Sequence, residues 1–270
     1  MARHDAATFT ANSRSLGLLC ALGVVIVTAG YAGVLGAGFM SLSSSADPIG
    51  DPYFPILETL ILLLMPLLVG LAVAIHAWTS ADRKSLSLLA VAFTIAQAVI
   101  TTSVHFVILA IGRQPAFLAL PQTPLFLSFT WPSVSYALDI LAWDGFFALA
   151  VLCAAPVFAG SRLAVAIRLL YLLAGLFALG GFGGVVFGDM RLRNIGIIGY
   201  IGVFPVAVLL LAGLLYRTRP SPAGPGDRAS RRPRPSIVDP KQQVTTGRYR
   251  EAQCSPSAAA VAPLPAKPFT

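Results

Sequence analysis

Six long apolar stretches constrain the fold of this chain more than any other feature of its sequence. A helix needs about 20 predominantly apolar residues to cross a bilayer, because it rises only about 1.5 Å per residue. Six stretches meet that requirement, at residues 16–40, 55–79, 86–112, 133–158, 163–188 and 195–216. Only 11% of the residues are charged, against about 25% in soluble domains. The sequence therefore predicts an all-α, polytopic membrane protein built as a bundle of six transmembrane helices.

Three regions follow from this pattern: a short cytoplasmic N-terminus (1–15), the transmembrane domain (16–216) and a C-terminal tail (217–270). The tail holds ten prolines and ten Lys or Arg residues against three acids, and it has few apolar side chains. Such a composition cannot build a core, so a disordered cytoplasmic tail is predicted. Because most of the net positive charge lies there, no nucleic-acid partner is expected. The tail is a candidate for contact with anionic lipid or a cytoplasmic partner.

The basic residues of the short connections predict the orientation in the membrane. The connections on one side hold Arg113, Arg191 and Arg193, whereas the other side holds seven basic residues (Arg3, Arg14, Arg83, Lys84, Arg162, Arg217 and Arg219). The positive-inside rule then places both termini in the cytoplasm. The first apolar run is 25 residues long, and signal-peptide cores have about 7–15, so it is interpreted as a span. The excess of Arg over Lys and the abundant Ala and Gly favour a bacterial inner membrane.

The fourth span carries two carboxyl groups, Asp139 and Asp144. Each costs roughly 2.5–3.5 kcal/mol at membrane depth, so such groups normally face other helices or a wet cavity. On a regular helix Asp139 shares a face with Tyr136 and Trp143, while Asp144 lies about 140° away. The two acids are therefore expected to meet different neighbours rather than form a carboxylate pair.

The third span carries a polar stripe, with Thr94, Gln97, Thr101 and His105 at helical spacing. In any alternating bundle, the start of the second span, the end of the third and the start of the fourth lie on one side of the membrane. Polar residues of these segments should therefore lie at comparable depth. The predicted intramembrane polar site consists of Glu58, Gln97, Thr101, His105, Arg113, Asp139, Trp143 and Asp144.

Each of these residues also has a structural interpretation. Glu58 lies near the start of its helix, where the helix dipole favours a carboxylate. Arg113 can extend to the membrane surface, and His105 can serve as a polar contact between helices. The two aspartates can be partners in structural ion pairs.

Two further features leave alternatives open. Glycines recur in the first span (Gly23, Gly30, Gly33 and Gly36) and at four-residue spacing in the fifth (Gly180, Gly184 and Gly188). Such stripes serve either a homo-oligomer interface or helix packing within one monomer. The connection 113–132 is apolar and holds four prolines; it is interpreted either as a lid or as a passive interfacial loop.

No motif identifies a reaction, a cofactor or a metal. The sequence has no HExxH, CxxC, GxSxG or phosphate-binding loop, which favours a function other than catalysis. The leading hypothesis is small-solute or proton-coupled transport through a polar site between the second, third and fourth spans. Two alternatives are a non-catalytic assembly, sensory or accessory protein, and a membrane enzyme that uses His105 as a base oriented by Asp139. The lipid bilayer is the only partner that all three share.

Overall fold

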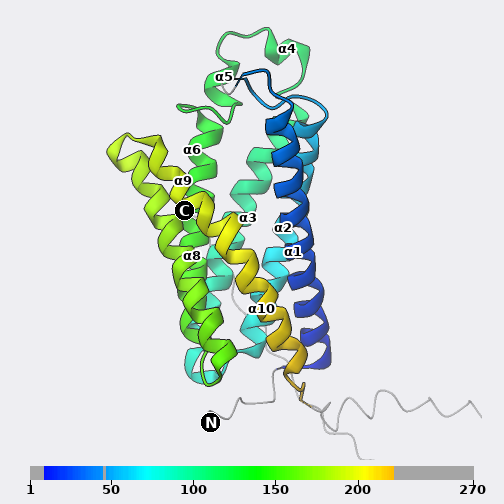
Figure 1. The fold of residues 1–270 in the computed structure, drawn as a ribbon, viewed down its shortest axis with the longest axis vertical. Coiled ribbons are helices and arrows are strands. Elements are labelled where there is room, and N and C mark those ends of the chain that lie inside the picture. Colours follow the sequence, from blue (N-terminus) through cyan, green and yellow to red (C-terminus); the bar gives the residue numbers. More distant parts are fainter. Residues whose placement is uncertain (1–8, 45–46, 222–270) are drawn as a thin grey trace, which may run out of the picture. The chain divides into compact units, whose positions relative to one another are not determined.

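The computed structural model describes residues 9–44 and 47–221, and the regular structure of these residues is entirely helical (Figure 1). The prediction of a six-helix membrane protein is confirmed, with each boundary within five residues of the expected one. Most of the predicted tail, from residue 222 onward, lies outside the described residues. The spans are α1 (Ala11–Met40), α2 (Tyr53–Trp78), η1 with α3 (Ala81–Ala110), the fourth span (Val134–Val157), α8 (Arg162–Phe187) and the sixth span (Met190–Arg217).

The fourth and sixth spans are irregular, because each contains a π-helical segment. The fourth span runs through α6 (Val134–Ile140), the π-helix η2 (Leu141–Phe147), α7 (Ala148–Ala154) and η3 (Ala155–Val157). The sixth runs through η4 (Met190–Leu192), α9 (Arg193–Ile197), the π-helix η5 (Ile198–Val203) and α10 (Phe204–Arg217). The two π-helices face each other, with the rings of Trp143 and Tyr200 5.0 Å apart. Such segments are frequent at functional sites.

The six spans form a closed ring in sequence order. Each span packs on the next, and the sixth returns to α1 through α10. At this closure the Arg14 guanidinium donates hydrogen bonds to the carbonyl oxygens of Leu215 (3.2 Å) and Tyr216 (2.6 Å). Further along, α9 and η5 pack on α8 instead, and in Figure 1 the sixth span diverges from α1 toward the end that carries α4 and α5. The ring is therefore tight at one end and wider at the other.

Glycines of α8 allow the sixth span to approach closely. A Cβ atom added at Gly181 would lie 2.9 Å from the Cα of Gly196, and one at Gly184 would lie 3.1 Å from the carbonyl oxygen of Asp189. Of the predicted stripe, Gly184 therefore packs within the monomer, whereas no atom lies within 4 Å of a Cβ added at Gly188.

In the first span a Cβ added at Gly23 would lie 3.0 Å from Leu67 of α2, whereas no atom lies within 4 Å of a Cβ added at Gly30, Gly33 or Gly36. A homo-oligomer through α1 stays a prediction.

Two connections lie at the same end of the ring, as the alternation of spans requires (Figure 1). The connection 113–132 holds the short helices α4 (Pro115–Leu118) and α5 (Thr123–Phe126), and Arg113 forms an ion pair with Asp51 of the other connection. The hydroxyl of Ser133 donates to the carbonyl oxygen of Ser128 (2.5 Å), and that of Ser135 donates to the carbonyl oxygen of Phe126 (2.6 Å). These bonds hold the connection to the start of α6.

Candidate functional site

A chain of alternating acidic and basic side chains crosses the interior of the ring. His105 of α3 contacts Glu58 of α2 through Nδ1 (2.8 Å to Oε2) and Asp139 of α6 through Nε2 (3.4 Å to Oδ1). The Arg193 guanidinium of α9 reaches Asp139 (Nη2 to Oδ2, 2.7 Å) and lies 3.6 Å, from Nε to Oδ2, from Asp144 of η2. These five residues, called the charged cluster below, join four of the six spans.

Burial makes the charged cluster energetically demanding. Each of its five residues is at most 7% exposed, and Asp144 is fully buried. Charges in a low-dielectric interior are tolerated only when they are paired and hydrogen-bonded. The pairing is incomplete, because no hydrogen-bond partner among the described residues satisfies His105 Nε2, Arg193 Nε or either carboxylate oxygen of Asp144.

The expectation that Asp139 and Asp144 meet different neighbours is wrong, since Arg193 lies against both. The expectation assumed regular helix geometry. The π-helix η2 begins at Leu141, between the two acids, and its i→i+5 bonding widens the turn, so residues five apart come closer to one face. Asp144 packs against the glycines where α8 and the sixth span meet, since its Oδ1 lies 2.4 Å from a Cβ added at Gly196.

Arg193 is the member of the charged cluster that sequence reasoning missed. It was assigned to the connection before the sixth span, but the helical structure begins at Met190 and turns Arg193 inward. Its Nη1 donates to the hydroxyl of Tyr136 (2.9 Å), and its guanidinium lies over that ring, 4.4 Å from the centroid. One signal in the sequence could have indicated Arg193: two buried acids need a buried cation to pair with.

Arg113 was expected at the depth of His105, and the structure places it elsewhere. Its side chain is exposed and pairs with Asp51 at the end of the ring that carries the two connections, which is called the loop end below. It ends the third span and therefore reaches the surface, which was its structural interpretation. The other predicted residues of α3, Gln97 and Thr101, are buried at 1% and 0% exposure and point into the protein, as the polar stripe required.

A large cavity of about 740 Å³ adjoins the charged cluster. Glu58, His105, Asp139 and Arg193 form part of its wall, together with Trp143. The rest of the wall is mainly apolar and comes from α1, α2 and the sixth span. The two connections at the loop end also contribute, and their exposed lining residues, Asp47 and Leu118, show that the cavity reaches the surface there.

Aromatic rings surround the charged part of the cavity. Phe129, from the connection 113–132, lies 5.0 Å from the His105 ring. Tyr31 of α1, Tyr136 of α6, and Trp143 with Tyr200 of the facing π-helices also line the wall. The arrangement therefore offers carboxylates, an imidazole and aromatic faces to one solute.

Within the two described segments, no group of three or more His, Cys, Asp and Glu side chains is placed to hold a metal ion. Comparison of the chain with protein family models, with curated proteins and with solved structures finds no match. The function is therefore inferred below from the geometry of this chain.

Proposed function

We propose that this membrane protein exchanges protons for small amphipathic cations, with the large cavity as the binding site. The observation that carries the proposal is that four of the five residues of the charged cluster, all but Asp144, form part of the wall of a mainly apolar cavity open at one end of the bundle. A charged wall at membrane depth is costly, and intramembrane acids that face a cavity are commonly part of a substrate or ion path.

The charges of the cluster favour cations. The cluster holds three carboxyl groups and one guanidinium, which stays protonated in proteins, and His105 is its only other group that can become a cation. With His105 neutral, the cluster carries an excess of negative charge in a low-dielectric region. Added protons and a bound cation both relieve this excess, so they compete for the same site. Such competition is the basis of exchange.

The walls favour a solute that is mainly apolar. Aliphatic side chains of α1, α2 and the sixth span contact its body, while its positive charge lies near Glu58 and Asp139. Aromatic faces such as those of Phe129 and Trp143 attract organic cations through their ring quadrupole. With both termini in the cytoplasm, the cavity opens on the outer side of the membrane, and the connection 113–132 covers it.

His105 is the proposed proton carrier. Its two ring nitrogens face different carboxylates, Glu58 and Asp139, so the ring can receive a proton on one side and release one on the other. Glu58 and Asp139 hold the ring in this orientation through the contacts at 2.8 and 3.4 Å.

Transport in liposomes tests the proposal. Purified protein is reconstituted with a pH dye inside, and ethidium, a mainly apolar cation, is added outside. We expect ethidium entry coupled to proton exit in the wild type. Glu58→Gln keeps the shape of the side chain but removes the carboxylate that exchanges protons with His105. It should lower the coupled flux by roughly 10²-fold, the low end for loss of a positioned acid or base.

The control for this experiment is Asp82→Asn, which removes an exposed acid at the opposite end of the bundle. It should leave the flux unchanged. The proposal would be rejected if liposomes with the wild-type protein showed the same ethidium flux and the same proton flux as liposomes without protein.

A second candidate function, as a non-catalytic assembly or accessory protein, is favoured by the way the cluster joins four spans. In that case the acids act only as structural partners. Asp139→Asn and Asp144→Asn distinguish the two functions. The structural role is supported if neither variant folds and the wild type does not bind ethidium. Retained folding with lost exchange supports transport.

A further inference from the structure

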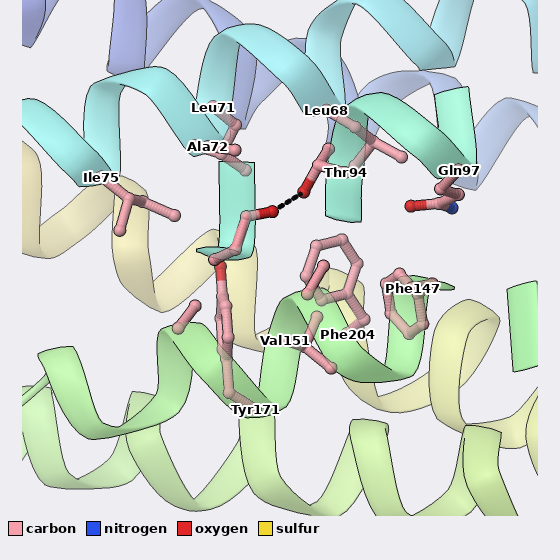
Figure 2. Close-up of a pocket in the computed structure, with 13 residues that line it drawn as sticks. Leu68, Leu71, Ala72, Ile75, Thr94, Gln97, Phe147, Val151, Tyr171 and Phe204 are labelled. Atoms are coloured by element: carbon pink, nitrogen blue, oxygen red, sulfur yellow. Dashed lines mark hydrogen bonds between the residues drawn. The ribbon is translucent and has the colours of Figure 1, made fainter. Parts of the chain in front are cut away.

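A second cavity, of about 40 Å³, adjoins the large one further from the loop end. Figure 2 shows Thr94 and Gln97 of α3 on one side of it and Tyr171 of α8 on the other, with Phe147 and Phe204 nearby. Leu68 of α2 and Phe204 line both cavities. These two apolar side chains therefore form the partition between the large cavity and the small one.

The small cavity contains buried polar atoms that lack protein partners. Among the described residues, neither Gln97 Nε2 nor the hydroxyl of Tyr171 has a hydrogen bond, and these residues are 1% and 2% exposed. Thr101 lies one turn from Gln97 toward the charged cluster, and its hydroxyl is also buried without a hydrogen-bond partner among the described residues. Leaving such groups unsatisfied costs on the order of 1–3 kcal/mol each, so buried polar groups nearly always have a partner, often water.

The dimensions and the chemistry of the small cavity suit water. A water molecule needs about 10–15 Å³ of such volume, so the cavity has room for about three. Gln97 supplies donors, and the Tyr171 hydroxyl both donates and accepts. The Thr94 hydroxyl donates to the carbonyl oxygen of Ala90 (2.8 Å; dashed in Figure 2) and retains the capacity to accept.

Polar groups of α3 continue from the small cavity toward the loop end, and in the opposite direction the next polar group is Ser87. Toward the loop end, Thr101 and then His105 follow Gln97 at four-residue intervals, or about 6 Å each. Toward the opposite end, Ala90 lines the cavity and Ser87 lies one turn beyond it. The Ser87 hydroxyl lies 2.8 Å from Nδ1 of His76.

We propose that the small cavity binds a short file of water molecules that conducts protons between the charged cluster and the opposite side of the membrane. The inference rests on the proposed function and deepens it, because it separates two routes. In this conformation Leu68 and Phe204 keep the organic cation in the large cavity, and it crosses in a step in which these two side chains move apart. Protons continue through water and the hydroxyls of Thr101 and Tyr171, with Gln97 as a hydrogen-bond partner that holds the water.

Each transfer in this file is balanced. A water or hydroxyl oxygen accepts one proton as a new O–H bond forms, and it releases another as an existing O–H bond breaks, so no other reactant is consumed. At one end the groups that exchange protons are Glu58, His105 and Asp139, with Arg193 as a fixed charge. At the other end they are His76 and Lys84, whose Nζ donates to the carbonyl oxygen of His76.

Hydroxyl-radical footprinting of the wild type in lipid nanodiscs tests for water without any solute. Two phenylalanines form a matched pair: Phe147 lines the small cavity and is 2% exposed, whereas Phe158 lines neither cavity and is 0% exposed. We expect oxidation of Phe147 several-fold faster than that of Phe158, with Tyr171 also modified. Equal, slow oxidation of Phe147 and Phe158 would show a dry cavity and overturn the inference.

Proton flux in liposomes tests the conduction step. Gln97→Leu keeps the approximate volume and removes the polar groups, so we expect a loss of coupled proton flux with ethidium binding retained. The control, Ser103→Ala, changes an exposed hydroxyl on the same helix and should have no effect. Unchanged proton flux in Gln97→Leu overturns the inference but leaves the proposed function standing, whereas a wild type that does not exchange ethidium for protons overturns the proposed function itself.

If Gln97→Leu does not fold, proton flux is measured in Tyr171→Phe, which keeps the ring and removes the hydroxyl that lines the small cavity. Unchanged coupled proton flux in that variant overturns the inference.

Discussion

At the scale of single residues, Arg193 controls the charge balance of the protein interior. It is the one permanent cation of the charged cluster, and it lies against Asp139 and Asp144 at once. The buried pair need not add net stability, because desolvation of the two charges offsets their attraction. Removing one partner is a different matter, since it leaves the other charges buried and unpaired.

We therefore expect Arg193→Gln to destabilise the fold by about 3–5 kcal/mol, the usual cost of breaking a buried pair. The neighbouring exposed Arg191 provides the control, and Arg191→Gln should change stability by less than about 0.5 kcal/mol. Denaturant titration of both variants in detergent measures the difference. Equal stability of the two variants would show that the cluster does not depend on Arg193.

The sequence predicted part of the charged cluster for a topological reason. Alternating spans require the start of the second, the end of the third and the start of the fourth to share one side, which brought Glu58, His105 and Asp139 together. Arg113 was misplaced because an arginine at a helix end can extend to either water or protein, and spacing does not decide between them. Arg193 was missed because the sixth span begins five residues earlier than its apolar run.

At the scale of helices, close approach of α8 and the sixth span decides where the acids lie. Gly181 and Gly196 bring the two backbones together beside Asp144. The π-helix η2 could not be predicted from apolar periodicity, because a single widened turn leaves the hydrophobic pattern of a span intact. The existence and order of the spans were predictable, since they depend only on length and composition.

Gly181 and Gly180 allow a matched test of this packing. Gly181→Ala should destabilise the protein by about 1–3 kcal/mol, the usual cost of overpacking, because its Cβ meets the backbone of Gly196. At the exposed Gly180 the nearest atom to an added Cβ lies 3.5 Å away. Gly180→Ala should therefore be neutral or stabilising by up to about 1 kcal/mol. Equal effects on thermal stability would contradict the close contact.

The connection 113–132 is expected to limit solute exchange through its tether to α6. Ser135→Ala removes the hydrogen bond to the carbonyl oxygen of Phe126, worth about 1 kcal/mol. Ethidium should then dissociate up to about fivefold faster in stopped-flow experiments, with Ser103→Ala as the control. Unchanged dissociation would identify the connection as a passive loop.

At the scale of the whole molecule, the ring of six spans provides two adjoining compartments along one path. The large cavity opens at the loop end and carries the charged cluster, and the small cavity continues beyond Leu68 and Phe204. In this conformation the apolar partition between the two cavities keeps larger solutes in the large cavity, while water in the small cavity can still carry protons. We therefore propose that the bundle works as an exchanger in which one acidic site binds protons and a cation in turn.

Proton release on cation binding tests this claim most directly. Ethidium is added to purified wild-type protein in weakly buffered detergent solution, and a pH indicator records protons while ethidium fluorescence records binding. We expect protons to be released as ethidium binds, and the ethidium affinity to rise with pH because fewer protons then compete for the acids. Binding without proton release, at an affinity independent of pH, would contradict the account.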